Sequence, residues 1–249
     1  MTTLSEHYHQ LTQDGTLQSD PAQIAALPEF ERVHDALLAP VPKRGLFRKA
    51  PEPPKGVYFW GGVGRGKSML MDLFVQHLDG IPARRVHFHA FMQEIHAAMH
   101  EVRKSGVEDA IAPVAADVAS SVRLLAFDEM QITDITDAMI VGRLFEALFK
   151  DGVVVIATSN RHPDDLYKDG LNRDLFLPFI ALIKERMVIH ELVSPTDYRQ
   201  GRLMGHPVYF TPVNAAARAE MDEVWNDLAG GPGTVSYTHL TLPTIRRGG

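Results

Sequence analysis

Residues 61–68 combine glycines, a lysine and a serine at the spacing of a phosphate-binding loop. The run Gly61-Gly62-Val63-Gly64-Arg65-Gly66-Lys67-Ser68 fits the pattern G-x-x-x-x-G-K-[ST]. Glycines let backbone N–H groups turn inward around an anion, at the positive end of the following helix. The lysine would reach the β- and γ-phosphates of ATP, and the serine hydroxyl would hold Mg²⁺. The predicted nucleotide-binding residues are Gly61, Gly62, Val63, Gly64, Arg65, Gly66, Lys67, Ser68 and Met69.

Two adjacent carboxylates, Asp128 and Glu129, end a second apolar run at 122–127. Carboxylates at the end of a strand that follows a phosphate loop are typical of a Walker B element. Asp128 would hold Mg²⁺ through water, and Glu129 would orient and polarise the attacking water. The alternative is that the pair only caps the next helix.

A third apolar run, 153–157, ends in Thr158-Ser159-Asn160. Because ligands of open parallel sheets sit at the carboxyl ends of strands, we expect Asn160 beside the phosphate loop and the two carboxylates. Asn160 resembles the residue that senses the γ-phosphate in AAA+ ATPases. Alternatively, it only opens the turn that follows.

The elements that must position these residues alternate between strands and helices. Strands are predicted near 56–60, 85–89, 123–128, 153–158 and 187–192. Apolar helices are predicted at 67–78, 91–103, 137–150 and 174–184. This order predicts an α/β fold in which helices sandwich a five-stranded parallel sheet, a P-loop NTPase of AAA+ type.

The rest of the chain divides by composition. Residues 1–40 are expected to be helical, with a helix start at Ser19-Asp20-Pro21 and a further amphipathic stretch at 30–38. Residues 41–55 hold four prolines and five basic residues and are expected to form a linker. Residues 56–192 would be the ATPase core, and 193–234 the start of a C-terminal region.

Composition excludes several classes. The 249 residues contain no cysteine, so there are no disulfides or thiol chemistry. No apolar run nears the length of a membrane span, and the first residues lack a secretion signal. The net charge of −6, with both signs mixed, argues against broad nucleic-acid binding. A cytoplasmic protein is expected.

Other residues have simpler interpretations than a second active site. His87, His89, His96 and His100 are spaced so that pairs would share a strand face or a helix face, which would permit zinc binding. Because no carboxylate is placed as an obvious third ligand, a surface or interface role is favoured. Asp134 and Asp137 are expected to cap a helix rather than bind metal.

Four stretches resemble the ZapE family of AAA+ ATPases: 56–74, 87–92, 127–139 and 157–173. The resemblance runs from about residue 8 to about residue 230. It implies ATP hydrolysis coupled to remodelling of a protein partner, with the division-ring protein FtsZ as the bacterial target. It also implies a ring of subunits at the division site or the inner-membrane face, with peripheral membrane contact.

The same resemblance suggests an arginine finger that enters the neighbouring subunit's site. Arg173 follows the sensor strand where AAA+ proteins place this residue, and Arg161 is the second candidate. The alternative is a surface arginine that caps its own helix. A finger contributes about 10³–10⁵ to the rate of phosphoryl transfer.

The C-terminal end departs from the family. Residues 235–244 read codon for codon as a translated transposon-end sequencing adapter, so the segment 235–249 is expected to carry no fold or function. Family members continue beyond this point, and the chain is therefore expected to be truncated, with an incomplete C-terminal region. Reading the underlying DNA tests this hypothesis.

Two other functional classes remain open. A nucleic-acid loader would need a basic surface, and the dense basic run lies in the 41–55 segment. A small-molecule kinase would need an arginine-rich lid, which the sequence does not indicate. A GTPase is disfavoured because no guanine-reading Asn-Lys-x-Asp motif follows the strands.

Overall fold

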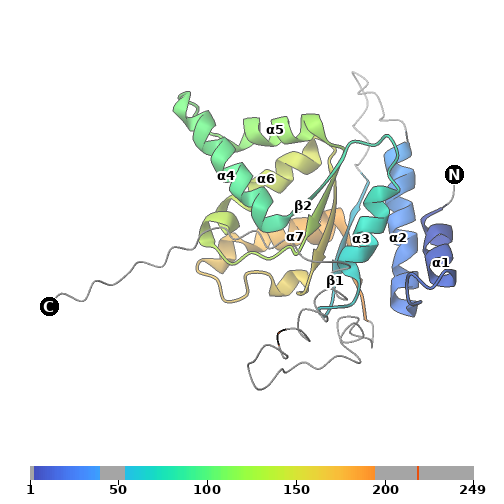
Figure 1. Cartoon of the computed structure of the whole chain (residues 1–249). Helices are drawn as coiled ribbons and strands as arrows, with labels where there is room; N and C mark the ends of the chain where they lie inside the picture. The colour runs from blue at the N-terminus through green and yellow to red at the C-terminus, as the bar shows by residue number, and fades with distance from the viewer. Residues whose placement is uncertain (1–2, 40–53, 194–217, 219–249) are drawn as a thin grey trace. The chain divides into compact units, whose positions relative to one another are not determined.

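Five parallel strands form one sheet in the order β2-β3-β4-β1-β5 (Figure 1). The strands are β1 (Gly56–Trp60), β2 (Ala83–His87), β3 (Leu124–Asp128), β4 (Val154–Ser159) and β5 (Met187–Glu191). In this order β1 lies between β4 and β5, with Trp60 opposite Ser159 on one side and Glu191 on the other. The predicted five-stranded parallel sheet is confirmed.

The computed structural model describes residues 3–39, 54–193 and 218. The chain divides into two units, Met1–Asp197 and Tyr198–Gly249, and the elements named here lie in the first. The expected linker, apart from its last two residues, and nearly all of the segments 193–234 and 235–249 lie outside the described residues.

Each strand sends alternate side chains to opposite faces of the sheet, and helices cover both faces. Val57 and Phe59 join the core beneath α1 (Leu4–Gln13), α2 (Pro21–Leu38) and α3 (Lys67–Gln76). Tyr58 joins the core on the other face. That face is covered by α4 (Phe88–Lys104), α5 (Ile111–Ser121), α6 (Ile135–Lys150) and α7 (Leu177–Arg186).

The N-terminal helices pack directly on the sheet. Asp20 caps α2 by accepting a hydrogen bond from the Ala22 N–H at 2.7 Å, and Pro21 occupies the first turn, as the sequence predicts. The ring of Phe30 stacks on that of Phe59 in β1, with centroids 4.5 Å apart, and lies 5.0 Å from that of Phe74 in α3. These contacts join α2 to the strand and helix on either side of the phosphate loop.

Two predicted boundaries were wrong, and one helix was not predicted. The second strand ends at His87 and α4 begins at Phe88, so His87 and His89 do not share a strand face. The helix α5 was missed. The helix predicted at 174–184 starts later, because a single 3₁₀ turn at Arg173–Leu175 precedes α7.

Candidate nucleotide-binding site

The phosphate loop joins the end of β1 to the start of α3. Gly66 is the residue before the first turn of α3, with φ +86°, in the left-handed region that favours glycine. A Cβ atom at Gly66 would lie 2.5 Å from Nε2 of Gln23, a separation that real Cβ atoms do not show. The left-handed backbone therefore favours a glycine at this point of the loop, and a larger residue would also displace the Gln23 amide.

Lys67 extends along the inside of the loop. Its Nζ donates to the carbonyl oxygens of Gly61 and Gly62, both at 2.8 Å, and to Oδ1 of Asn160 at 3.1 Å. Burial lowers the pKa of the Lys67 ammonium, while the nearby charge of Asp128 works in the opposite direction. The chain thus gathers an ammonium group and Asn160 at one point, as the strand-end argument predicts.

Asp128 is almost fully buried, and three side chains donate hydrogen bonds to it. Its Oδ1 accepts from Ser68 Oγ and from Thr158 Oγ1, both at 2.7 Å, and its Oδ2 accepts from Arg85 at 2.8 Å. Burial raises the pKa of Asp128, but these hydrogen bonds and the charge of Arg85 outweigh it and hold the pKa below its ordinary value. Asp128 is therefore an ionised carboxylate at neutral pH.

A hard cation fits this donor set, because a hydroxyl and a carboxylate oxygen lie side by side at the start of α3. Ser68 and Asp128 would hold Mg²⁺, as predicted from the two motifs. When bound, the cation would neutralise charge on the phosphate oxygens.

Glu129 follows Asp128 with a left-handed backbone at φ +53°. Its N–H donates to Thr158 Oγ1 at 3.1 Å, and the next N–H, of Met130, donates to the carbonyl oxygen of Thr158 at 2.7 Å. This turn separates the two carboxylates, so that Asp128 is buried and Glu129 is exposed. The two residues can take different roles only because the backbone turns here.

A cavity of about 180 Å³ brings most of the predicted residues together, although Gly61, Gly62 and Asp128 are not part of its lining. Its volume suits the phosphate end of a nucleotide better than a whole nucleotide. Its lining comes from the loop and from the ends of β3 and β4: Val63, Gly64, Arg65, Gly66, Lys67, Ser68, Met69, Glu129, Thr158, Ser159 and Asn160.

A buried polar chain from the N-terminal helices supports the loop. The Tyr8 hydroxyl donates to Oε1 of Gln23 at 2.9 Å, and Nε2 of Gln23 donates to the carbonyl oxygen of Arg65 at 3.3 Å. Tyr8 is fully buried and Gln23 is 2% exposed. Sequence reasoning missed Gln23, Thr158 and Arg85 as parts of the site, because their roles depend on contacts between separate elements.

The predicted finger residue lies on a separate turn. The guanidinium of Arg173 donates to the carbonyl oxygens of Leu166, at 2.7 Å, and Asp164, at 2.6 Å. Arg161 is exposed, and its carbonyl oxygen accepts from the Tyr58 hydroxyl at 2.9 Å. Neither arginine lines the cavity of the phosphate loop in the described part of the chain. Their role toward a second subunit stays a prediction.

Two histidines of the sequence pattern, His89 and His96, line one cavity together with Asp134 and Asp137. Nε2 of His96 lies 2.7 Å from Oδ1 of Asp137, in the first turn of α6. Asp134 caps α6 by accepting from the Thr136 N–H at 2.6 Å, so this expected cap is observed. His89 lies near Gln93 on α4, with their Nε2 atoms 3.1 Å apart.

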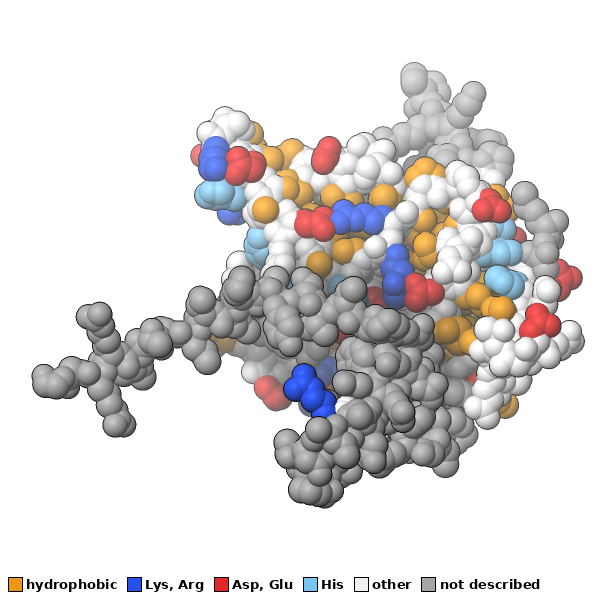
Figure 2. Space-filling model, viewed as in Figure 1, with side chains coloured by type: hydrophobic (Ala, Val, Ile, Leu, Met, Phe, Trp, Pro, Cys, Tyr) orange, Lys and Arg blue, Asp and Glu red, His pale blue; other side chains and the backbone are white. Residues whose placement is uncertain are grey.

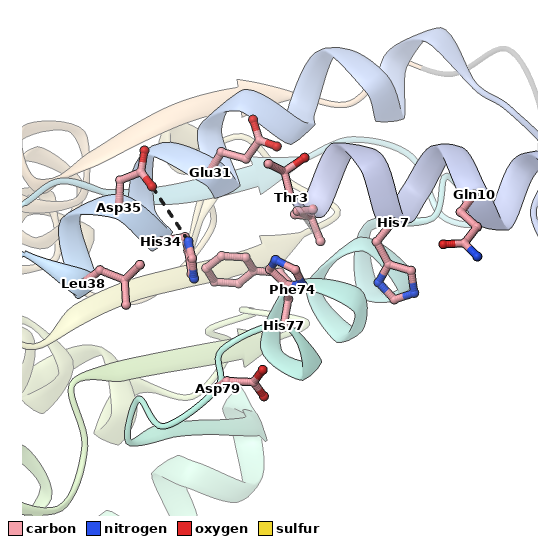
Figure 3. A pocket seen from close by; sticks show the side chains of 11 residues that line it. Thr3, His7, Gln10, Glu31, His34, Asp35, Leu38, Phe74, His77 and Asp79 are labelled. Carbon is pink, nitrogen blue, oxygen red and sulfur yellow. Dashed lines mark ion pairs between the residues drawn. The ribbon is translucent and has the colours of Figure 1, made fainter. Parts of the chain in front are cut away.

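A second cavity, of about 540 Å³, lies among α1, α2 and α3 (Figure 3). Three histidines line it: His7 of α1, His34 of α2 and His77 directly after α3. The ring centroid of His77 is 5.6 Å from that of His34 and 6.5 Å from that of His7. Among residues 3–39 and 54–193, no three His, Cys, Asp or Glu side chains are arranged to hold a metal ion.

The fold and the site together define a P-loop NTPase of AAA+ type. The model of the AFG1-like ATPase family matches residues 2–242, and the chain belongs to this family. The match reaches into the segment 235–249, whose origin in an adapter stays a prediction.

Relatives from bacteria and eukaryotes cover most of the chain. It is 36% identical to the cell division protein ZapE of Escherichia coli K12, over 98% of the chain and 69% of that protein. It is 37% identical to the lactation elevated protein 1 homolog B of Danio rerio, over 79% of the chain and 50% of that protein. The chain is thus shorter than either relative.

Solved structures share the fold at low identity. Domain III of the Thermotoga maritima replication initiation protein DnaA is 16% identical, with a TM-score of 0.52, over 88% of this chain and 90% of that one. The DnaC helicase loader is 17% identical, with a TM-score of 0.51, over 76% of this chain and 99% of that one. These likenesses concern the fold alone.

Proposed function

We propose that the chain is a Mg²⁺-dependent ATPase that couples hydrolysis to the remodelling of a protein partner. The observation that carries the proposal is the single cavity at which Lys67, Ser68, Glu129 and Asn160 meet, with Asp128 bonded to Ser68 behind it. A phosphate loop alone would only bind a nucleotide. An exposed carboxylate beside the loop adds a group that can orient an attacking water.

Each residue has one part in this chemistry. Lys67 exchanges its bonds to the loop carbonyls for phosphate oxygens. Asn160, already within hydrogen-bond distance of Lys67 Nζ, lies where it can report on the terminal phosphate. Glu129 accepts the proton of the attacking water, since it is exposed in the cavity rather than paired with Arg85 as Asp128 is.

The partner that we propose is the division-ring protein FtsZ, and the working form is a ring in which Arg173 completes the neighbouring site. The similarity to a cell division protein supports this choice. On the face shown in Figure 2, acidic and basic side chains lie beside one another over the described surface, which favours a protein partner over nucleic acid. No helix in the described part of the chain is long and apolar enough to cross a membrane. The proposal also places the protein in the cytoplasm, attached peripherally to the inner membrane.

ATP hydrolysis per subunit, measured against protein concentration with Mg²⁺ at low salt, tests the proposal. We expect specific activity to rise steeply with concentration and to rise further when FtsZ is added. Lys67→Ala is the control, because it removes the phosphate-binding ammonium. A flat profile would exclude sites shared between subunits. Activity that survives in Lys67→Ala would exclude this site altogether.

A further inference from the structure

Arg85 lies behind the predicted magnesium site, on the edge strand β2. It pairs with Ala126 in the register of the sheet and therefore points to the same face as Asp128, two residues further along β3. Its guanidinium has two carboxylate partners. One nitrogen donates to Oδ2 of Asp128 at 2.8 Å, and the other lies 2.9 Å from Oδ1 of Asp72.

The two carboxylates belong to the two halves of the nucleotide site. Asp72 is on α3, the helix that starts with Lys67 and Ser68, and Asp128 ends β3. Arg85 therefore links the phosphate-loop helix to the acidic strand through a third element. A planar guanidinium fixes the directions of both bonds, which a lysine ammonium does not.

The bond to Arg85 also decides which oxygen of Asp128 faces the cation site. Oδ2 is held by Arg85 on one side, while Oδ1 accepts from Ser68 and Thr158 on the other. A carboxylate held at both oxygens cannot rotate without breaking a hydrogen bond. Oδ1 is thus fixed beside the Ser68 hydroxyl, where a bound cation would replace the Ser68 hydrogen bond.

We propose that Arg85 is a positioning residue for the magnesium site, which holds Asp128 in place by anchoring it to Asp72 of the phosphate-loop helix. The inference deepens the proposed function and rests on it, because it concerns the cation of the same site. Arg85 does not touch the nucleotide; it acts through Asp128. Groups that hold a metal-binding carboxylate commonly change metal affinity about 10–100-fold when they are replaced.

The test is a titration of Mn²⁺, used in place of Mg²⁺, into the full chain with ADP, followed by electron paramagnetic resonance. The variants are Arg85→Lys, which keeps the positive charge but cannot bond both carboxylates through a planar group, and Arg85→Gln, which loses both properties. We expect each to weaken Mn²⁺ binding roughly tenfold. Binding of a fluorescent ADP without metal should be unchanged, because neither variant alters the loop.

The matched control is Arg84→Lys, one residue earlier on the same strand. Arg84 points to the opposite face and pairs with Glu94 of α4, so this variant should bind Mn²⁺ like the parent. Asp72→Asn, which removes only the partner of Arg85 on α3, should also weaken Mn²⁺ binding. Thermal unfolding of all four variants identifies a failure to fold.

Three outcomes would overturn the inference. Unchanged Mn²⁺ affinity in both Arg85→Lys and Asp72→Asn would mean that the ion pairs only stabilise the fold. Tighter binding in Arg85→Gln would mean that the arginine acts through its charge rather than by holding Asp128. A parent chain that binds ADP but no Mn²⁺ would remove the proposed magnesium site itself, and the inference with it.

Discussion

The backbone of Glu129 forms a turn, and its side chain is the predicted catalytic carboxylate. A non-glycine residue in the left-handed region costs about 1–2 kcal/mol, and Glu129 adopts it at φ +53° where β3 ends. Two hydrogen bonds to Thr158, one from Glu129 and one from Met130, hold the turn. Strain of this kind is maintained where the surrounding structure fixes it, and here it exposes a carboxylate to the cavity.

The change Glu129→Gln should stop turnover and leave nucleotide binding intact. The amide keeps the size of the side chain but cannot accept a proton, and general-base catalysis contributes about 10²–10⁴ to a rate. Single-turnover ATP hydrolysis and fluorescent-nucleotide binding measure the two quantities separately. Turnover within a few-fold of the parent would show that another group activates the water.

At this scale the sequence predicts the residues that belong to a motif and misses those that support it. Lys67, Ser68 and Asp128 follow from local spacing, since each lies at a fixed offset from a strand end. Arg85 and Gln23 carry no local signal: each becomes part of the site only when β2 and α2 pack beside α3.

Among the elements, α2 does more than cover the sheet. Its Gln23 lies between the Tyr8 hydroxyl and the carbonyl oxygen of Arg65 in the phosphate loop; the first contact is buried and the second partly buried. A buried polar group is costly when its partner is missing, so the pair is sensitive to single changes. The N-terminal helices are therefore coupled to the loop.

A double-mutant cycle on Tyr8 and Gln23 should reveal this coupling. We expect Gln23→Met to lower the free energy of unfolding by about 1–3 kcal/mol, because it removes a hydrogen-bond partner from buried groups. Nucleotide affinity should fall as well, because the carbonyl oxygen of Arg65 in the phosphate loop loses its hydrogen bond from Gln23. Tyr8→Phe should lower the free energy of unfolding less in the Gln23→Met background than in the parent chain. Strictly additive effects in urea unfolding would show that the two side chains act independently.

Element boundaries were harder to predict than element types. The alternation in His87-Phe88-His89 suits a strand, but Phe88 turns into the core against Phe127, with ring centroids 5.6 Å apart, and starts α4. A period of two over three residues cannot separate a strand from the first turn of a helix. Tertiary packing of Phe88 decided this boundary.

At the scale of the whole molecule, the question is whether one chain holds a complete site. The described residues supply the phosphate loop, Asp128 and Glu129, but the predicted finger Arg173 is bonded to the carbonyl oxygens of Leu166 and Asp164. To act on a neighbouring subunit, its guanidinium would have to exchange these two bonds for phosphate contacts. Exposed Leu171 and Leu175 flank the same turn and give it an apolar surface.

Mixing two inactive variants tests this arrangement. Arg173→Ala should lower turnover by about 10³–10⁵ if the arginine is a finger, and Glu129→Gln lacks the base. In a mixed ring, a subunit with Arg173→Ala keeps its own Glu129 and receives Arg173 from a Glu129→Gln neighbour. ATPase activity should therefore reappear on mixing and depend on the ratio of the two.

Arg173→Ala also removes two bonds within its own chain, so its thermal unfolding must be measured beside its activity. A lowered melting temperature together with no recovery on mixing would assign Arg173 to the local turn. Activity can recover only if one site combines Glu129 from the Arg173→Ala subunit with Arg173 from the Glu129→Gln subunit, because neither variant alone supplies both residues. Recovery on mixing therefore shows a shared site, and its absence assigns Arg173 to a local role provided that the variant is folded at the assay temperature.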